Sequence, residues 1–206
     1  MITIALPKGR LMEESIDILN KKGLNVDIVK NSRKLFFYDK NEDYKFLIVR
    51  AQDVATYVEY QAADLGIVGF DVLTESSKDV FELTDLGIGY CKMVVAGKSK
   101  ECFEQKTNNI RVATKFVNVA KKYFEQKGIN AEIIKLYGSI ELAPLLGIAD
   151  CIVDIVSTGR TLRENGLEVL DEIFESTAML IANRVTFYTK NSKIKKFIDI
   201  IDEKNN

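Results

Sequence analysis

Short apolar runs alternate with amphipathic segments along most of this chain, a pattern typical of α/β proteins. Residues 2–6 form a continuous apolar run that predicts a buried strand. Residues 10–22 place apolar positions on one side of a predicted helix, which Gly23 ends. We therefore expect an α/β fold with largely parallel sheets.

The rest of the chain repeats these two patterns. Residues 34–38 and 44–49 flank a polar turn and predict a β-hairpin. Asp53 is placed to cap one helix, and Ser139 is placed to cap another that carries Glu141. The remaining expected elements are strands at residues 64–68, 80–83, 110–113, 131–136, 151–156 and 178–182, and helices at residues 54–63, 117–127 and 190–206, the last with Ile194, Phe197, Ile198 and Ile201 on its apolar side.

A glycine-containing apolar stretch interrupts this alternation near the middle of the chain. This stretch covers residues 87–97, and the strand and helix patterns start again after it. We interpret the stretch as a crossover between two lobes, with residues 178–182 returning the chain. The expected division is a first lobe of residues 1–89 plus 178–206 and a second lobe of residues 90–177.

The most informative chemistry lies in the nine residues from Asp154 to Leu162. Asp154 ends a predicted strand, and a carboxylate there can accept hydrogen bonds from a ribose diol. The hydroxyls of Ser157, Thr158 and Thr161 and the backbone N–H groups around Gly159 can surround a phosphate. A simple surface turn is the alternative, because Ser, Thr and Gly gather in loops generally.

A longer pattern around this loop points to one family. The spacing is E-x5-G-x-A-x2-I-x-D-I-x2-T-G-x-T-L, carried by Glu141, Gly147, Ala149, Ile152, Asp154, Thr158, Gly159, Thr161 and Leu162. In this pattern the chain resembles the ATP phosphoribosyltransferase family. Residues 2–11 and 64–71 are also similar to that family, so the resemblance covers nearly the whole chain. Nucleotide-salvage phosphoribosyltransferases usually have two adjacent acids in this loop, whereas Val153 precedes Asp154 here.

The resemblance implies a bilobal fold like that of type II periplasmic binding proteins, with two crossover segments and a substrate cleft between the lobes. It implies that N1 of the ATP adenine attacks C1 of 5-phosphoribosyl 1-diphosphate, giving N1-(5-phosphoribosyl)-ATP and pyrophosphate in the first step of histidine biosynthesis. Mg²⁺ is expected to arrive with the substrates, with no protein ligand assigned to it. The second lobe is expected to carry the phosphoribosyl-binding loop.

The chain resembles the short form of this family, which lacks a C-terminal regulatory domain. The resemblance therefore implies a separate regulatory subunit similar to histidyl-tRNA synthetase, and a homodimer within a hetero-oligomer. For phosphoribosyl diphosphate it implies contacts from the loop. Arg160 matches no fixed position of the family and could either touch the phosphate or face solvent. Glu141 could orient the loop or hold the ribose, although a Glu at a helix start is also favoured by the helix dipole alone.

Positively charged residues elsewhere are candidates for the ATP site. Lys8, Gly9 and Arg10 lie where the first strand meets its helix, a position where α/β folds bind ligands, although solvated surface charge would give the same spacing. Arg50 can clamp a triphosphate or pyrophosphate and is a candidate for catalysis with Asp154; an ion pair with Asp53 is its alternative. Two weaker candidates, Arg33 beside the hairpin and Asp71 as a possible helix cap, complete this set.

Composition narrows the class of protein further. A net charge of −1 and 47% hydrophobic residues over 206 positions argue against a general nucleic-acid binder. The chain has no histidine, which removes imidazole catalysis and histidine metal ligands. The spacing of the three cysteines, Cys91, Cys102 and Cys151, suggests no disulfide framework. The chain starts with no secretory signal, and no apolar run reaches the roughly 20 residues of a membrane span. A cytoplasmic location is therefore expected.

Two other functions remain open from the residues alone. A non-catalytic small-molecule-binding protein would share the bilobal fold, although such proteins usually carry an export signal. A salvage phosphoribosyltransferase would use a free base in place of ATP, and the single loop acid argues against it.

Overall fold

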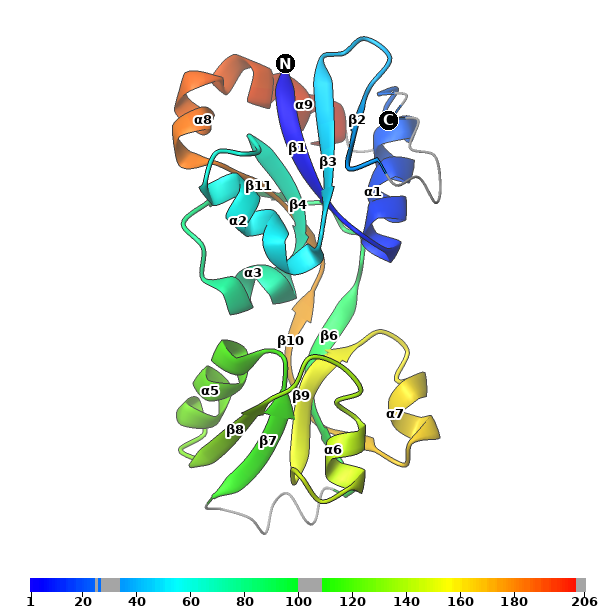
Figure 1. Cartoon of the computed structure of the whole chain (residues 1–206), viewed down its shortest axis with the longest axis vertical. Coiled ribbons are helices and arrows are strands. Elements are labelled where there is room, and N and C mark those ends of the chain that lie inside the picture. The colour runs from blue at the N-terminus through cyan, green and yellow to red at the C-terminus, as the bar shows by residue number, and fades with distance from the viewer. Residues whose placement is uncertain (25, 27–33, 100–108, 203–206) are drawn as a thin grey trace. The chain divides into compact units, whose positions relative to one another are not determined.

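The computed structural model describes residues 1–24, 26, 34–99 and 109–202, and these form two compact units (Figure 1). One unit comprises Met1–Gly89 together with Thr177–Asn206, and the other comprises Tyr90–Ser176. Thr177, which the sequence analysis grouped with the second lobe, lies in the first unit. Its carbonyl accepts a hydrogen bond of 2.9 Å from the backbone N–H of Phe70.

A six-stranded sheet in the order β2-β3-β1-β4-β11-β5 forms the centre of the first unit. Its strands are β1 (Ile2–Pro7), β2 (Phe36–Tyr38), β3 (Tyr44–Val49), β4 (Leu65–Gly69), β5 (Phe81–Asp85) and β11 (Ala178–Ala182). β1 is parallel to both β3 and β4, so the carboxyl ends of these three strands lie at one edge of the sheet.

Helices cover both faces of this sheet (Figure 1). They are α1 (Arg10–Lys21), the 3₁₀ turn η1 (Ala51–Asp53), α2 (Val54–Glu59), α3 (Phe70–Ser76), α8 (Arg184–Thr189) and α9 (Asn191–Asp202). Leu19 of α1 and Phe197 of α9 are fully buried against one face. Val54 and Val58 of α2 and Leu73 of α3 are buried against the other.

The second unit has a five-stranded sheet in the order β10-β6-β9-β7-β8. Its strands are β6 (Cys91–Gly97), β7 (Ile110–Thr114), β8 (Ala131–Lys135), β9 (Cys151–Val156) and β10 (Glu168–Ser176). The helix α5 (Val117–Gln126) packs on one face through Ala120 and Phe124. The short helices α6 (Leu142–Leu145) and α7 (Arg160–Glu164) cover the other face through Ala143 and Leu162.

Strand direction is the main difference from the expected fold. Among the strand pairs of the described residues, four are parallel (β1 with β3 and β4, and β7 with β8 and β9), and the other five are antiparallel. The expectation of largely parallel sheets was therefore wrong. The antiparallel neighbours include β6, β10 and β11, the strands next to the two points where the chain passes from one unit to the other. These strands do not belong to the strand-helix-strand repeats that give parallel pairs.

Several boundaries differ from expectation, and those of α2 and α6 bear on the expected helix caps. α2 ends at Glu59 rather than at residue 63, and the side chain of Asp53 makes no capping hydrogen bond. α6 begins at Leu142, so Glu141 precedes the helix, and Ser139 has a left-handed φ of 48° and does not cap it with its side chain. No helix in the described ranges has the length and apolar character needed to span a membrane.

Candidate functional site

The loop between β9 and α7 forms one wall of a pocket in the second unit. β9 ends at Val156, three residues form a turn, and α7 begins at Arg160. Gly159 takes the left-handed conformation with φ 70°, which glycine adopts without the steric cost of a Cβ. The pocket has a volume of about 150 Å³ and is lined by Val94, Ala96, Glu141, Ile152, Asp154, Ile155, Val156, Ser157, Thr158, Gly159, Arg160, Thr161 and Leu162. All seven residues that the sequence predicts for phosphoribosyl diphosphate line this pocket.

Several hydrogen-bond donors of the loop are available to an anion. Within the described residues, no backbone or side-chain acceptor takes the N–H of Ser157, Gly159 or Thr161. The N–H of Arg160 makes one long hydrogen bond of 3.4 Å to the hydroxyl of Thr158. A turn with converging N–H groups and hydroxyls is suited to a phosphate group.

Asp154 lies in this pocket near the carboxyl end of β9. The groups around it shift the pKa of its carboxyl in opposite directions. Burial raises the pKa of the Asp154 carboxyl above its usual value of 3.8. The ammonium of Lys115 and the N–H of Ile155, which donates to Oδ1 at 2.8 Å, act to lower this pKa, while the nearby Glu141 adds to its rise. The carboxylate can accept hydrogen bonds from sugar hydroxyls when it is ionised.

Lys115 is the residue of this pocket region that sequence reasoning missed. Its Nζ lies 3.5 Å from Oδ1 of Asp154, although 39 residues separate the two along the chain. The available signal was its position two residues after the predicted strand 110–113, but nothing in the sequence shows that this strand pairs with β9.

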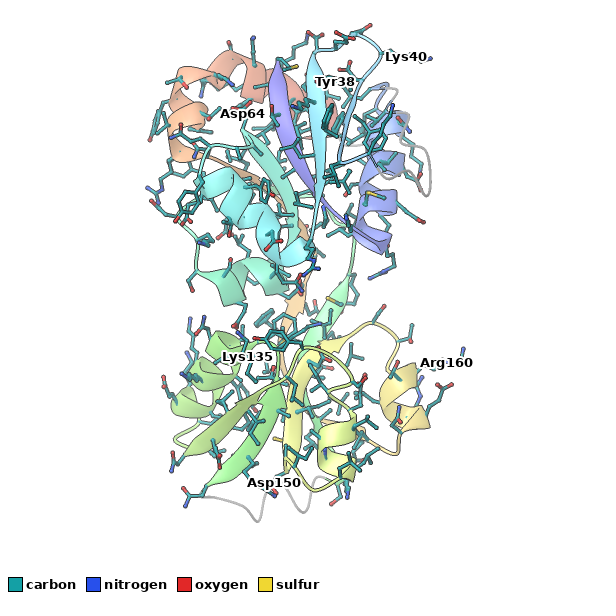
Figure 2. The ribbon with its side chains drawn as sticks, in the orientation of Figure 1. Tyr38, Lys40, Asp64, Lys135, Asp150 and Arg160 are labelled. Atoms are coloured by element: carbon teal, nitrogen blue, oxygen red, sulfur yellow. The ribbon has the colours of Figure 1, made fainter. Side chains whose placement is uncertain are left out.

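Arg160 is oriented differently from a simple phosphate ligand. Its Nε donates to Oε1 of Glu164 at 2.6 Å, and the arginine side chain is 80% exposed. Figure 2 shows the side chain on α7, pointing outward. The backbone N–H of Arg160, rather than its guanidinium, faces the loop turn.

A second set of candidate residues lies at the carboxyl edge of the first unit's sheet. Pro7 and Val49 are register partners in β1 and β3, so Lys8 and Arg50 follow neighbouring strand ends. The N–H of Lys8 donates to the Val49 carbonyl at 2.8 Å. Both side chains belong to exposed residues, and neither has an ion-pair partner among the described residues. The alternative of an Arg50–Asp53 ion pair is therefore not observed.

The other candidates of this unit have individual positions. Gly9 has φ 97° and forms the turn into α1, and Arg10 pairs with Glu14 at 3.1 Å. Asp71 is buried in the first turn of α3, where Gly69 takes the N-cap position, and its carboxylate lies close to Gly69. Arg33 lies outside the described residues.

The potential for metal binding by the protein alone is small in the part of the chain described. No group of three or more Cys, Asp or Glu side chains gathers there in a way that would hold a metal ion. The pocket contributes two carboxylates, from Asp154 and Glu141, together with the donors of the loop.

Comparisons with known proteins agree with this geometry. A sequence profile of the HisG family, described as ATP phosphoribosyltransferase, matches residues 50–203. The ATP phosphoribosyltransferase of Caldanaerobacter subterraneus subsp. tengcongensis is 52% identical over 201 residues, covering 96% of this chain and 94% of the relative. The enzyme of Thermoanaerobacter sp. strain X514 is 54% identical over 198 residues, covering 96% and 92%.

A solved structure gives the same result for the fold. The ATP phosphoribosyl transferase (HisG:HisZ) complex from Thermotoga maritima contains a chain that matches with a TM-score of 0.84 and 38% identity, over 98% of both chains. The type II periplasmic-binding-protein-like fold expected from the sequence is confirmed. A salvage enzyme or a non-catalytic binding protein is not favoured by these matches. The spacing of the loop, the pocket that it lines and these full-length matches establish that the chain belongs to the ATP phosphoribosyltransferase family.

Proposed function

We propose that this protein condenses ATP with 5-phosphoribosyl 1-diphosphate, with N1 of the adenine attacking C1 of the ribose. The products are N1-(5-phosphoribosyl)-ATP and pyrophosphate, the first step of histidine biosynthesis. The observation that carries the proposal is the pocket of the second unit, in which one buried carboxylate faces a loop of phosphate-binding donors. That combination matches the two ends of a phosphoribosyl group.

In this proposal the second unit binds phosphoribosyl diphosphate. Asp154 accepts hydrogen bonds from the ribose hydroxyls, and Glu141 stands beside it in the same pocket. The residues from Ser157 to Thr161 hold the 5-phosphate through hydroxyls and backbone N–H groups. Positive charge develops on the ribosyl ring as the pyrophosphate leaves, so a fixed carboxylate nearby stabilises the transition state.

The ATP-binding role falls to the first unit. Lys8 and Arg50 follow neighbouring strand ends and are the exposed cations best placed to bind a triphosphate or the pyrophosphate. Gly9 lets the backbone turn between Lys8 and Arg10, and Arg10 would have to exchange its contact with Glu14 for the ligand. Arg33 and Asp71 are proposed as further contributors from sequence resemblance.

A divalent metal ion, proposed to be Mg²⁺, fits this site when it arrives on the substrate phosphates. Mg²⁺ keeps several waters and is commonly bound through substrate phosphates, so no protein ligand is assigned to it. The metal would neutralise the charge of the departing pyrophosphate. The protein's own contribution is to orient the ribose and the phosphates.

We also propose a regulatory partner. The structure from Thermotoga maritima is a HisG:HisZ complex, and this chain matches its catalytic component in length and fold. The chain is therefore proposed to act as a dimer within a hetero-oligomer, with a separate subunit similar to histidyl-tRNA synthetase. The proposed location is the cytoplasm.

The test is product formation from ATP, 5-phosphoribosyl 1-diphosphate and Mg²⁺, with inorganic pyrophosphatase present to remove one product. Phosphoribosyl-ATP and pyrophosphate are measured with the chain alone and with the regulatory subunit added. Asp154→Ala should reduce turnover by about 100-fold or more, whereas Glu132→Ala, at an exposed carboxylate on β8 in the same unit, should leave it unchanged. A folded protein that forms no product under both conditions would refute the proposal.

A further inference from the structure

Lys115 and Asp154 are brought together by the register of two parallel strands. Thr114 ends β7 and pairs with Val153 of β9, so the next residues, Lys115 and Asp154, lie side by side at the carboxyl edge of the sheet. The backbone hydrogen bonds of this pairing are formed within the core of the second unit. The proximity is therefore a product of the fold and not of a flexible surface chain.

A buried hydroxyl holds the turn from which Lys115 projects. Oγ1 of Thr114 donates to the Val153 carbonyl at 2.6 Å and accepts from the N–H of Phe116 at 2.8 Å. The first bond ties Thr114 to β9, and the second ties Phe116 to Thr114, so the residues on both sides of Lys115 are held in place. The direction of the lysine side chain is consequently restricted at its base.

The ammonium group of Lys115 has two partners that restrict its other end. Nζ lies 3.5 Å from Oδ1 of Asp154 and 4.8 Å from the centroid of the Phe116 ring. The side chains of Lys115 and Asp154 are 31% and 16% exposed, so the pair is partly shielded from solvent. An ion pair in this position acts through a lower effective dielectric than one on an open surface.

The charges around Asp154 show why a cation is needed there. Burial and the neighbouring Glu141 both favour the protonated carboxyl, and burial is the largest influence on its pKa. Lys115 and the N–H of Ile155 are the two groups that favour the carboxylate. A protonated carboxyl would keep only part of its capacity to accept hydrogen bonds from a ribose diol.

We propose that Lys115 is a positioning residue of the phosphoribosyl site, which keeps the Asp154 side chain ionised and oriented toward the ribose. The effect of Lys115 on the reaction rate rests on the proposed function. Its physical basis, the ion pair between strand ends, holds in the ligand-free protein whatever reaction the site performs.

The first test therefore measures the ion pair without turnover. The carboxyl ¹³C resonance of Asp154, assigned by its loss in Asp154→Asn, is titrated in the ligand-free wild type, in Lys115→Gln and in Lys115→Arg. The pKa of Asp154 should rise in Lys115→Gln and stay close to the wild-type value in Lys115→Arg, since arginine retains the charge. An unchanged pKa in Lys115→Gln overturns the proposal, whether or not the protein is a transferase.

The second test uses the reaction. The value of kcat/KM for phosphoribosyl diphosphate is measured at saturating ATP from the lowest pH at which the protein stays folded up to neutral pH, because each unit of pKa change alters the ionised fraction about tenfold on the acid side. The acid limb of Lys115→Gln should move to higher pH, with a loss of kcat/KM that is greatest at the acid end and disappears toward neutral pH. Lys115→Arg should restore the limb, and Lys121→Gln, at an exposed position of α5, should match the wild type.

A uniform loss of activity at all pH values, with no shift of the limb, would mean that Lys115 has only a structural role and would overturn the proposal. Circular dichroism identifies any variant that fails to fold, and Lys115→Met then replaces Lys115→Gln as the uncharged variant. If the wild type itself makes no phosphoribosyl-ATP, the proposed function fails, and the carboxyl titration still decides whether Lys115 controls Asp154.

Discussion

Replacing Gly159 by alanine tests whether the loop conformation serves phosphate binding. Gly159 has φ 70° and ψ 7°, and a left-handed residue with a Cβ costs about 1–2 kcal/mol. The added Cβ would lie 3.0 Å from Nη1 of Arg163 and 3.7 Å from Cγ1 of Val156, and the arginine tip can move aside. The loss of stability should therefore come mainly from the strained backbone conformation. For a chain of this size, each kcal/mol lost lowers the melting temperature by about 2–4 °C.

The effect on substrate binding should be larger than the effect on stability suggests. The N–H groups of Ser157, Gly159 and Thr161 have no acceptor among the described residues, so we expect a bound phosphate to take them. A loop that relaxes away from the left-handed turn would lose about one hydrogen bond to a charged group, worth about 1.5–3 kcal/mol. The KM for phosphoribosyl diphosphate should then rise about tenfold to 100-fold.

A matched control separates these two effects. Gly128 follows α5 in the same unit, has φ 69°, and has no atom within 4 Å of a built Cβ. Gly128→Ala should cost the same backbone energy and leave the KM unchanged. The assay is steady-state production of phosphoribosyl-ATP together with thermal unfolding of both variants. Equal stability losses with a wild-type KM for Gly159→Ala would refute the assignment of the loop to phosphate binding.

Three further predictions concern stability. The pKa of Asp154 in the folded state is raised above 3.8, so its charge opposes folding at neutral pH. Asp154→Asn should therefore increase the free energy of unfolding at neutral pH, as measured by urea titration, and this gain should disappear below about pH 3.8. An equal difference between the two proteins at every pH would contradict this. Thr114→Val should cost about 1–3 kcal/mol by leaving the Phe116 N–H and the Val153 carbonyl without their partner, while Thr114→Ser should retain most of the stability in the same urea assay. Phe197→Ala should cost about 3–5 kcal/mol because the ring is fully buried between α9 and the sheet, and a loss below 1 kcal/mol by chemical denaturation would mean that α9 does not pack as described.

Local patterns predicted most of the secondary structure. The strands at β9 and β11 have the expected bounds, and β1, α1 and α5 differ from expectation by one residue at most. The expected apolar side of the C-terminal helix is confirmed by the burial of Ile194, Phe197 and Ile201. These elements were predictable because apolar periodicity and glycine stop signals act over a few neighbouring residues.

β10 and α8 are among the elements that escaped prediction, because their sequences give weak local signals. β10 contains four acidic residues among its nine positions and has irregular register with β6 at Val169/Asp171 and Glu172/Phe174. Its acidic residues are largely solvent-facing or paired, as in the contact of Lys92 with Glu172 at 2.9 Å. α8 is a six-residue helix whose N-cap, Asn183, is fixed by burial and by hydrogen bonds to the carbonyls of α2 residues. Both depend on partners distant in sequence.

The sequence by itself determined the family, the alternation of strands and helices, and the composition of the loop from Asp154 to Thr161, because these depend on the order of neighbouring residues. Only the tertiary structure decided which strands are antiparallel, and only it placed Lys115 beside Asp154. Strand pairing is set by backbone hydrogen bonds and burial between segments tens of residues apart. The same burial changes the ionisation of Asp154, a property that no local pattern encodes.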